Sequence, residues 1–285
     1  MHLMEHMMLL AALVSTNVVF SKNVTKIKPK YITVRNIQCD SEVLINNISG
    51  PYHLAIDNSA NTLFFSYTVR NKTSEERFQI GYINLDTKNS TMNTVADIHG
   101  GFAITVNNFG TVVYMGGDNG LYTFNYETNN VTKLGTFNKS IWQMFYKDKL
   151  YFTTYPEGKA YVYRLDGSVE ELAELHNTGR VEKLALTHKN VFILANSSGL
   201  YAYDEKKGKL LVGQFLIESF ATDIIGNLYF STSDRICYIN EKNQVETVAN
   251  INDIFGFTID EDGHGIYSNA DSIIRLKPRK NEKEQ

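Results

Sequence analysis

The chain has 285 residues, of which 43% are apolar and 21% are charged, so it can bury a sizeable core and is not a disordered polymer. Its formal net charge of −3 is spread along the sequence without a basic stripe, and no internal apolar run reaches the roughly 18 residues of a membrane span. We therefore expect neither nucleic acid nor a membrane as a partner. The 17 Tyr and 16 Phe, set against only 4 Pro, favour strands over helices.

The first residues have the pattern of a secretory signal peptide. From Met7 to Phe20 the chain reads MMLLAALVSTNVVF, an apolar run of suitable length that is too short to span a membrane. Ser21 completes a small-residue cleavage site, and Ser15 is a second candidate. The leader contains Glu5 and no Lys or Arg, so a buried apolar N-terminal strand is the alternative. We expect residues 1–21 to be a signal peptide and the protein to be secreted.

Seven Asn-x-Ser/Thr sequences are acceptors for N-linked glycans and agree with secretion. Several of them lie in polar turns, where a glycan can be accommodated, and we expect a few to be occupied. The candidates are Asn23, Asn47, Asn71, Asn89, Asn130, Asn138 and Asn196.

One pattern recurs six times: an apolar strand, a turn opened by a polar residue, and a second strand with aromatic or β-branched residues. It begins with LAIDNSANTLFFS, from Leu54, and ends with FTIDEDGHGIYSN, from Phe257. Successive turns are 36 to 50 residues apart. The residues that open them are Asp57, Asn107, Lys147, Thr187, Asp223 and Asp260.

Two further strands complete each unit. A third strand follows, as in GYINL from Gly81 and GLYAYD from Gly199, and a polar turn leads to a fourth strand. In the third unit the fourth strand is VEELAEL, from Val169 to Leu175. This segment taken alone looks helical, but its place in the repeat predicts a strand.

The sixth unit ends after its third strand, SIIRLK (Ser272 to Lys277), and lacks a fourth. The segment EVLINNI, from Glu42 to Ile48, stands before the first unit and can supply it. Six four-stranded units closed by an N-terminal strand describe an all-β, six-bladed β-propeller, in which closure protects the sheet edges. A seven-bladed ring is the alternative, but no seventh copy is found. We expect the propeller to span residues 39–278, after an N-terminal extension of residues 22–38 and before a charged tail of residues 279–285.

This architecture places the two cysteines on neighbouring blades. Cys39 begins the closing strand of the sixth blade, and Cys237 lies in the third strand of the fifth. Neighbouring blades can bring such residues close, so we predict a Cys39–Cys237 disulfide that holds the closing strand. Two free thiols are the alternative, because they have the same sequence.

Common catalytic motifs are absent: the chain has no G-x-S-x-G elbow, Walker loop, G-x-G-x-x-G or H-E-x-x-H. The seven histidines show no metal-ligand spacing. His53, His99 and His176 occupy equivalent places near strand junctions, where a metal site would need converging side chains, and loop histidines are the simpler interpretation. The turn from Asp260 to Gly263 resembles part of a calcium loop but lacks its other ligands, which favours a hairpin turn. We expect no catalytic residue, no metal and no cofactor.

Equivalent positions of the first strands approach the axis of a propeller, so a column of the repeat becomes a ring in space. Five residues before each turn residue, the column is aromatic in four units and acidic in two. We expect an aromatic-lined, partly acidic mouth that binds a flat organic ligand, with packing of these aromatics between blades as the alternative. The column is Tyr52, Phe102, Trp142, Glu182, Glu218 and Phe255, with Ser219 or Phe220 replacing Glu218 if the alignment shifts there.

Several runs resemble those of the insect ommochrome-binding proteins: GPYHLAIDNSANTLFFSY, GLYTFNYETN, SIWQMFYKDKLYFTTYP, IFGFTIDEDG and IIRLKP. The resemblance extends from about Cys39 to Pro278 and includes the leader and the order of the repeats. It implies a secreted haemolymph protein that binds and transports an ommatin, a planar, acidic phenoxazinone pigment. No binding residue is carried over from the family, so the expected site rests on the repeat column alone.

Three functions therefore compete. The preferred hypothesis is a non-catalytic, monomeric carrier of an ommatin or a similar planar aromatic metabolite in haemolymph. The second is a propeller hydrolase or lactonase with a metal on the axis, and the third is a secreted propeller that binds another protein through its loops. A stoichiometric divalent ion would distinguish the hydrolase from the carrier.

Overall fold

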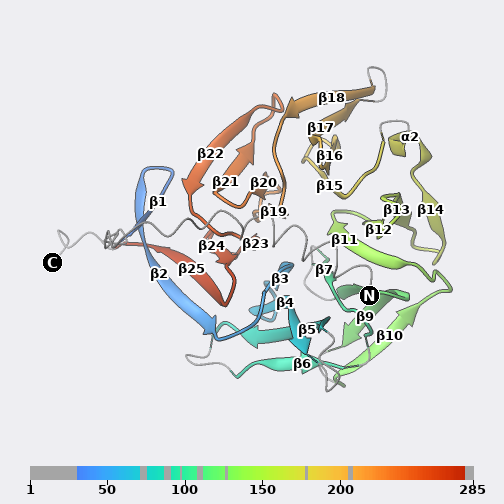
Figure 1. Cartoon of the computed structure of the whole chain (residues 1–285), viewed down its shortest axis with the longest axis horizontal. Coiled ribbons are helices and arrows are strands. Elements are labelled where there is room, and N and C mark those ends of the chain that lie inside the picture. The colour runs from blue at the N-terminus through green and yellow to red at the C-terminus, as the bar shows by residue number, and fades with distance from the viewer. Residues whose placement is uncertain are drawn as a thin grey trace.

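The structure, a computed structural model, describes residues 31–279 except 71–75, 87–90, 97, 108–111, 126–127, 177–178 and 205–207. Six antiparallel sheets surround a central axis, as Figure 1 shows. The inner strands of successive sheets contact one another, and the last inner strand contacts the first, so the ring is closed. The predicted six-bladed β-propeller is confirmed, whereas the predicted signal peptide lies outside the described residues.

The blades follow one another in chain order, and within each blade the strands run from the axis to the rim. The first blade comprises β3 (Leu54–Asp57), β4 (Thr62–Arg70), β5 (Glu76–Asn84) and β6 (Asn93–Val95). The second comprises β7 (Ala103–Val106), β8 (Val113–Gly117), β9 (Gly120–Asn125) and β10 (Asn130–Leu134). The third comprises β11 (Ser140–Tyr146), β12 (Leu150–Tyr155), β13 (Ala160–Tyr163) and β14 (Val169–Glu171). The fourth comprises β15 (Lys183–Leu186), β16 (Phe192–Asn196), β17 (Gly199–Asp204) and β18 (Gly208–Gly213). The fifth comprises β19 (Ser219–Thr222), β20 (Leu228–Ser231), β21 (Arg235–Ile239) and β22 (Val245–Asn250). The sixth comprises β23 (Gly256–Ile259), β24 (Gly265–Ser268) and β25 (Ser272–Pro278), with a closing strand from the N-terminal side.

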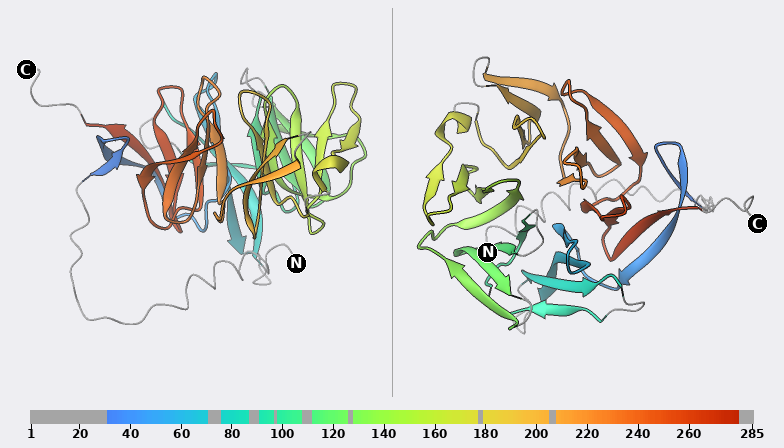
Figure 2. Two further views of the ribbon diagram at one scale, coloured as in Figure 1. Left: turned by 90° about the horizontal axis from the view of Figure 1, so that it is seen from above. Right: turned by 180° about the vertical axis from the view of Figure 1, so that it is seen from behind.

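That closing strand is β2 (Ile37–Asn46), which pairs antiparallel with β25 and confirms the predicted closure. The short strand β1 (Ile32–Val34), which the repeat did not predict, pairs with β2 and extends this sheet to five strands. Figure 2 shows the β1–β2 hairpin in blue at the edge of the ring. Its turn also contacts the fifth blade, because the N–H of Arg35 donates to the carbonyl oxygen of Val248 at 3.0 Å. The closing sheet therefore connects two neighbouring blades.

Side-chain oxygens explain why most of the repeated turn residues are Asp, Asn or Thr. Asp57 Oδ1 accepts a hydrogen bond from the backbone N–H of Ser59 at 2.9 Å, which fixes the turn between β3 and β4. The same local role belongs to Asn107, Thr187, Asp223 and Asp260. Lys147 differs, because its Nζ donates to the carbonyl oxygens of Thr187 (2.6 Å) and His188 (2.9 Å) in the next blade.

The hydrophobic core lies in layers between blades, and the two cysteines belong to different layers. Cys237 is buried among residues of the third, fourth and fifth blades, whereas Cys39 packs in the layer between the fifth and sixth blades. Ile236, the neighbour of Cys237, shares the layer of Cys39. Because successive side chains of a strand point to opposite faces, Cys237 points away from Cys39. Both thiols are free, so the predicted disulfide is wrong.

The segment from Val169 to Leu175, predicted as one strand, is divided. β14 pairs with β13 and ends at Glu171, and a single helical turn, α2 (Ala173–His176), follows. Leu175 is fully buried in the core of the neighbouring blades, which explains why the chain turns inward here. Among the described residues, no helix combines the length and apolar character that crossing a membrane requires.

Candidate functional site

A cavity of about 440 Å³ lies on the central axis and is lined by residues of all six blades. Small-molecule sites typically measure roughly 300–1,000 Å³. Apolar side chains such as Ile56, Val106 and Met144 form part of its wall, and polar groups supply the larger share of the cavity surface. Ile224 and Ile225, in the turn after β19, also line it and are 74% and 76% exposed, so this end opens to solvent.

Three ionisable side chains lie at the opposite end, where the inner strands begin: His53, Lys183 and Glu218. We call these three residues the floor. Lys183 Nζ donates a hydrogen bond to the carbonyl oxygen of Ile217 at 2.8 Å. Within the described part of the chain, no hydrogen bond or ion pair engages the His53 imidazole or the Glu218 carboxyl group.

Burial dominates the electrostatics of the floor. It lowers the pKa of His53 to about 3, with the charge of Lys183 as a second cause, so the imidazole is neutral at neutral pH. Burial also lowers the pKa of Lys183, although Glu218 and Glu182 oppose the shift, and it raises the pKa of Glu218 against the opposing effect of Lys183. Every shift disfavours the charged form, so the protein itself compensates these charges incompletely.

The four aromatic members of the predicted column form one continuous row of rings, which we call the aromatic row. Tyr52 stacks on Phe255 with 5.2 Å between ring centroids and 5° between planes. Phe102 stacks on Trp142 at 4.9 Å and 28°, and Tyr52 and Phe102 are 6.1 Å apart. Phe102 is buried and the other three rings are half-buried. The structure therefore brings the aromatic column together, with its rings packed largely on one another.

The aromatic row contacts the floor but does not line the cavity. Of the six column residues, all of them described, only Glu218 is part of the cavity wall. The His53 ring lies 4.5 Å from the Phe102 ring, and Lys183 Nζ lies 6.0 Å from the centroid of Trp142. Glu182 is half-buried on the fourth blade and acts on Lys183 through its charge.

Three polar cavity residues lie one position after the predicted column. From the sequence, His53 is considered only as a possible metal ligand, and Gln143 and Lys183 are missed. His53 follows Tyr52, Gln143 follows Trp142, and Lys183 follows Glu182. A shift of one residue along a strand moves a side chain to the other face, so the two sets point in different directions. The signal in the sequence that could have identified these residues is their polarity at the start of otherwise apolar strands.

The other histidines do not join His53. His99 Nδ1 lies 2.8 Å from Asp118 Oδ2, and the side chain of His176 is outside the described part of the structure. Among the described residues, the group with metal-ligand spacing is Asp260, Asp262 and His264, which lies off the cavity wall. Asp260 Oδ1 accepts the backbone N–H of His264 at 2.7 Å, so the segment forms the expected hairpin turn.

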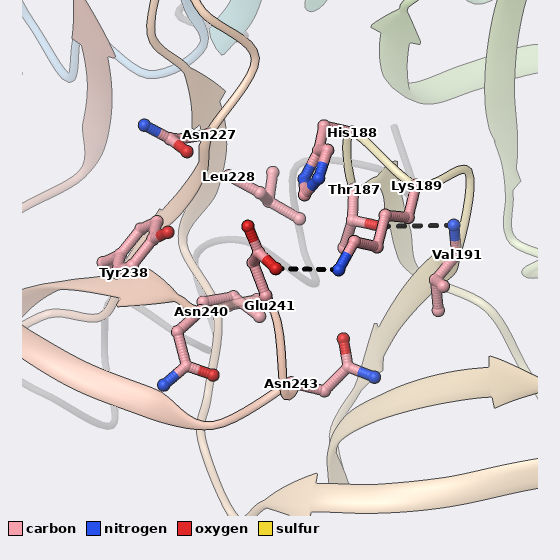
Figure 3. Close-up of a pocket in the computed structure, with 11 residues that line it drawn as sticks. Thr187, His188, Lys189, Val191, Asn227, Leu228, Tyr238, Asn240, Glu241 and Asn243 are labelled. Carbon is pink, nitrogen blue, oxygen red and sulfur yellow. Dashed lines mark hydrogen bonds and ion pairs between the residues drawn. The ribbon is translucent and has the colours of Figure 1, made fainter.

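A smaller hollow lies between the fourth and fifth blades (Figure 3). The ion pair of Lys189 Nζ with Glu241 Oε2, at 2.8 Å, crosses it, and the N–H of Val191 donates to Thr187 Oγ1 at 3.2 Å. Its volume of about 40 Å³ accommodates only a few water molecules. The axial cavity is therefore the candidate functional site.

The fold and the cavity define a six-bladed β-propeller with an axial site of small-molecule size. No family model matches the chain. Over 257 residues it is 34% identical to the ommochrome-binding protein of Manduca sexta, and the alignment covers 87% of this chain and 91% of that relative. The chain belongs to the ommochrome-binding protein family, as its sequence motifs predicted.

Solved structures share the fold at low identity. A gluconolactonase of Xanthomonas campestris has a TM-score of 0.70 and 12% identity, with 92% of this chain and 99% of that chain covered. A virginiamycin B lyase of Staphylococcus aureus has a TM-score of 0.55 and 11% identity, with 85% and 99% covered. These similarities concern the architecture alone.

Proposed function

We propose that the protein binds an ommochrome, or a similar planar aromatic metabolite, in the axial cavity and transports it unchanged. The Manduca sexta relative is named for ommochrome binding. The observation that carries the proposal to this chain is the cavity of about 440 Å³, with a wall of mixed polar and apolar side chains, an open end and an ionisable floor. Such a site buries a flat ring against the walls while Lys183 faces its acidic groups.

In this proposal the aromatic row supports the floor, because its rings contact His53 and Lys183. Trp142 lies within cation–π reach of Lys183, so a pigment at the floor is close to the single tryptophan of the chain. Separate substitutions of Trp142 and Lys183 decide whether the pigment also stacks on Trp142.

We further propose that the protein is secreted into haemolymph as a monomeric glycoprotein. The apolar run of residues 7–20 and the sequons support secretion. Asn47, Asn130 and Asn138 are exposed. Asn196 is half-buried, and its Nδ2 donates to the carbonyl oxygen of Arg180 at 2.9 Å, so it is the least suitable described acceptor. Asn23, Asn71 and Asn89 lie outside the described residues.

A metal-dependent hydrolase or lactonase is the alternative, because the gluconolactonase shares the fold. In the described part of the chain, the wall of the axial cavity offers no group of three closely spaced carboxylate, imidazole or thiol ligands.

Titration of the purified protein with an ommatin, followed by absorption spectroscopy and calorimetry, tests the proposal. We expect saturable binding of one pigment per chain, and release of the same pigment when the complex is denatured. Absence of binding would contradict carrier function. Lactone hydrolysis that depends on a stoichiometric divalent ion would favour the alternative.

A further inference from the structure

The floor of the axial cavity presents two opposite charges that are not paired with each other. Lys183 begins β15 in the fourth blade, and Glu218 directly precedes β19 in the fifth. No contact within the 4.0 Å of an ion pair joins these two described side chains. Each is nevertheless close enough to shift the pKa of the other. A ligand group placed between the two side chains would therefore have a cation on one side and an anion on the other.

The hydrogen-bonding capacity of the floor is also largely unused. An ammonium group has three N–H donors, and the structure shows one from Lys183, to Ile217. The Glu218 carboxyl group and the neutral His53 imidazole have no hydrogen-bond partner among the described residues. Because these donors and acceptors face the cavity without a partner among the described protein residues, they are available to a ligand that supplies both kinds of partner.

We propose, as a refinement that rests on the proposed function, that the floor binds a zwitterionic α-amino-acid group of the ligand. The ligand carboxylate pairs with Lys183, and its ammonium pairs with Glu218. The neutral His53 donates its N–H to the same carboxylate. The aromatic part of the ligand extends along the apolar side chains of the wall toward Ile224 and Ile225 at the open end.

Charge complementarity selects this class over simpler ions. A purely anionic group would satisfy Lys183 but add a second negative charge beside Glu218, and a purely cationic group would do the reverse beside Lys183. A zwitterion supplies a partner to each side chain and adds no net charge to a partly desolvated site. It also compensates both charges that burial disfavours.

The proposal is tested by measuring the affinity of two ligands for two proteins. The ligands are an ommatin with a free α-amino group and the same ommatin with that amine acetylated, which removes only the ammonium charge. The proteins are the parent and Glu218→Gln, which keeps the shape of the side chain. We expect acetylation to weaken binding to the parent by about tenfold or more, which corresponds to about 1.4 kcal/mol. Glu218→Gln should weaken binding of the ligand with the free amine by a similar factor and leave the affinity for the acetylated ligand nearly unchanged.

Two further variants complete the experiment. Lys183→Met should weaken both ligands, since both retain the carboxylate. Glu241→Gln, at the rim and outside the axial cavity, is the matched control and should leave both affinities unchanged. Circular dichroism and melting temperatures establish that each variant is folded.

The possible failures are distinguishable. Equal weakening of both ligands by Glu218→Gln would overturn amino-acid recognition and leave ommochrome binding intact. If Glu218→Gln does not fold, the parent alone decides, because equal affinity for the two ligands overturns the proposal. A parent that binds neither ligand would reject the proposed function itself.

Discussion

Glu42 and Arg275, 233 positions apart in the chain, form an ion pair with 2.7 Å between Oε2 and Nε that joins β2 to β25. Lys277 Nζ contacts the same oxygen at 3.0 Å. Burial raises the pKa of Glu42, but the hydrogen bonds from Arg275 and Lys277 outweigh this effect, and the net pKa is lowered. The Arg275 side chain is only 11% exposed, and Glu42 is its nearer carboxylate partner, since Asp260 Oδ2 lies 3.7 Å from its Nη1.

Glu42→Gln should therefore lower the free energy of unfolding at pH 7 by about 1–2 kcal/mol, measured by denaturant titration. The loss is modest because Glu42 is itself 38% exposed and partly screened by solvent. A lowered folded-state pKa stabilises the fold above the ordinary value of 4.5, so the difference from the parent should shrink as the pH falls below it. The control Glu241→Gln removes an exposed ion pair and should have no measurable effect. Equal losses in the two variants would contradict the special role of Glu42.

Deletion through Ile48 should expose the edge of β25 and give an aggregating or molten protein. Deletion through Asn36 is the matched control, because it removes β1 and leaves the pairing of β2 with β25. Size-exclusion chromatography and thermal unfolding compare the two. A soluble longer deletion with an unchanged melting temperature would contradict closure by β2.

His53 should make stability depend on acid pH. Its folded-state pKa of about 3 is below its ordinary value of 6.5, so between these values the unfolded chain binds a proton that the folded chain does not. The contribution of the neutral imidazole to the free energy of unfolding is therefore complete above pH 6.5. It is lost as the pH falls below that value, by up to about 1.4 kcal/mol per pH unit. Denaturant titrations of the parent and His53→Gln should diverge through this window. Parallel profiles would show that the imidazole is not protected from protonation.

The two thiols should resist alkylation in the native protein and both react after denaturation. Cys39 and Cys237 are 3% and 0% exposed, and burial is the main cause that raises both thiol pKa values. A low thiolate fraction and poor access both slow the reaction. Mass spectrometry of the unreduced, denatured protein counts the thiols, and a count of zero would restore the disulfide.

Trp142→Ala separates stacking on the aromatic row from binding in the cavity. If the pigment stacks on the indole, affinity should fall about tenfold, which is about 1.4 kcal/mol. Intrinsic fluorescence follows binding to the parent, and calorimetry follows binding to the variant. Lys183→Met is the comparison within the floor. Unchanged affinity in a folded Trp142→Ala, with loss in Lys183→Met, would confine the ligand to the axial cavity.

The order of the blades could be predicted because it depends on local chemistry that repeats. Asp57 and its equivalents other than Lys147 accept hydrogen bonds within their own hairpins, so these turns mark their units without reference to the rest of the chain. The closing strand could be predicted because one unit lacked a strand and the chain supplied one elsewhere.

The direction of individual side chains could not be predicted in this way, because it depends on register. The ladder between β11 and β12 shifts between Ile141 and Gln143, with Trp142 as the extra residue, and that between β21 and β22 shifts with Val248 as the extra residue of β22. Such irregularities change which face a residue occupies without leaving a signal in the repeat. Lys183 was missed for a related reason: the column was counted one position away from it.

The pairing of β2 with β25 also sets an order of events during protein synthesis. At about 5–20 residues per second, β2 leaves the ribosome roughly ten to fifty seconds before its partner strand exists. The blades between them can fold as each one is completed, but the ring stays open until β25 emerges. Until then, the edge of β2 that faces β25 stays unpaired in the nascent chain, and β1 is the partner available to its other edge.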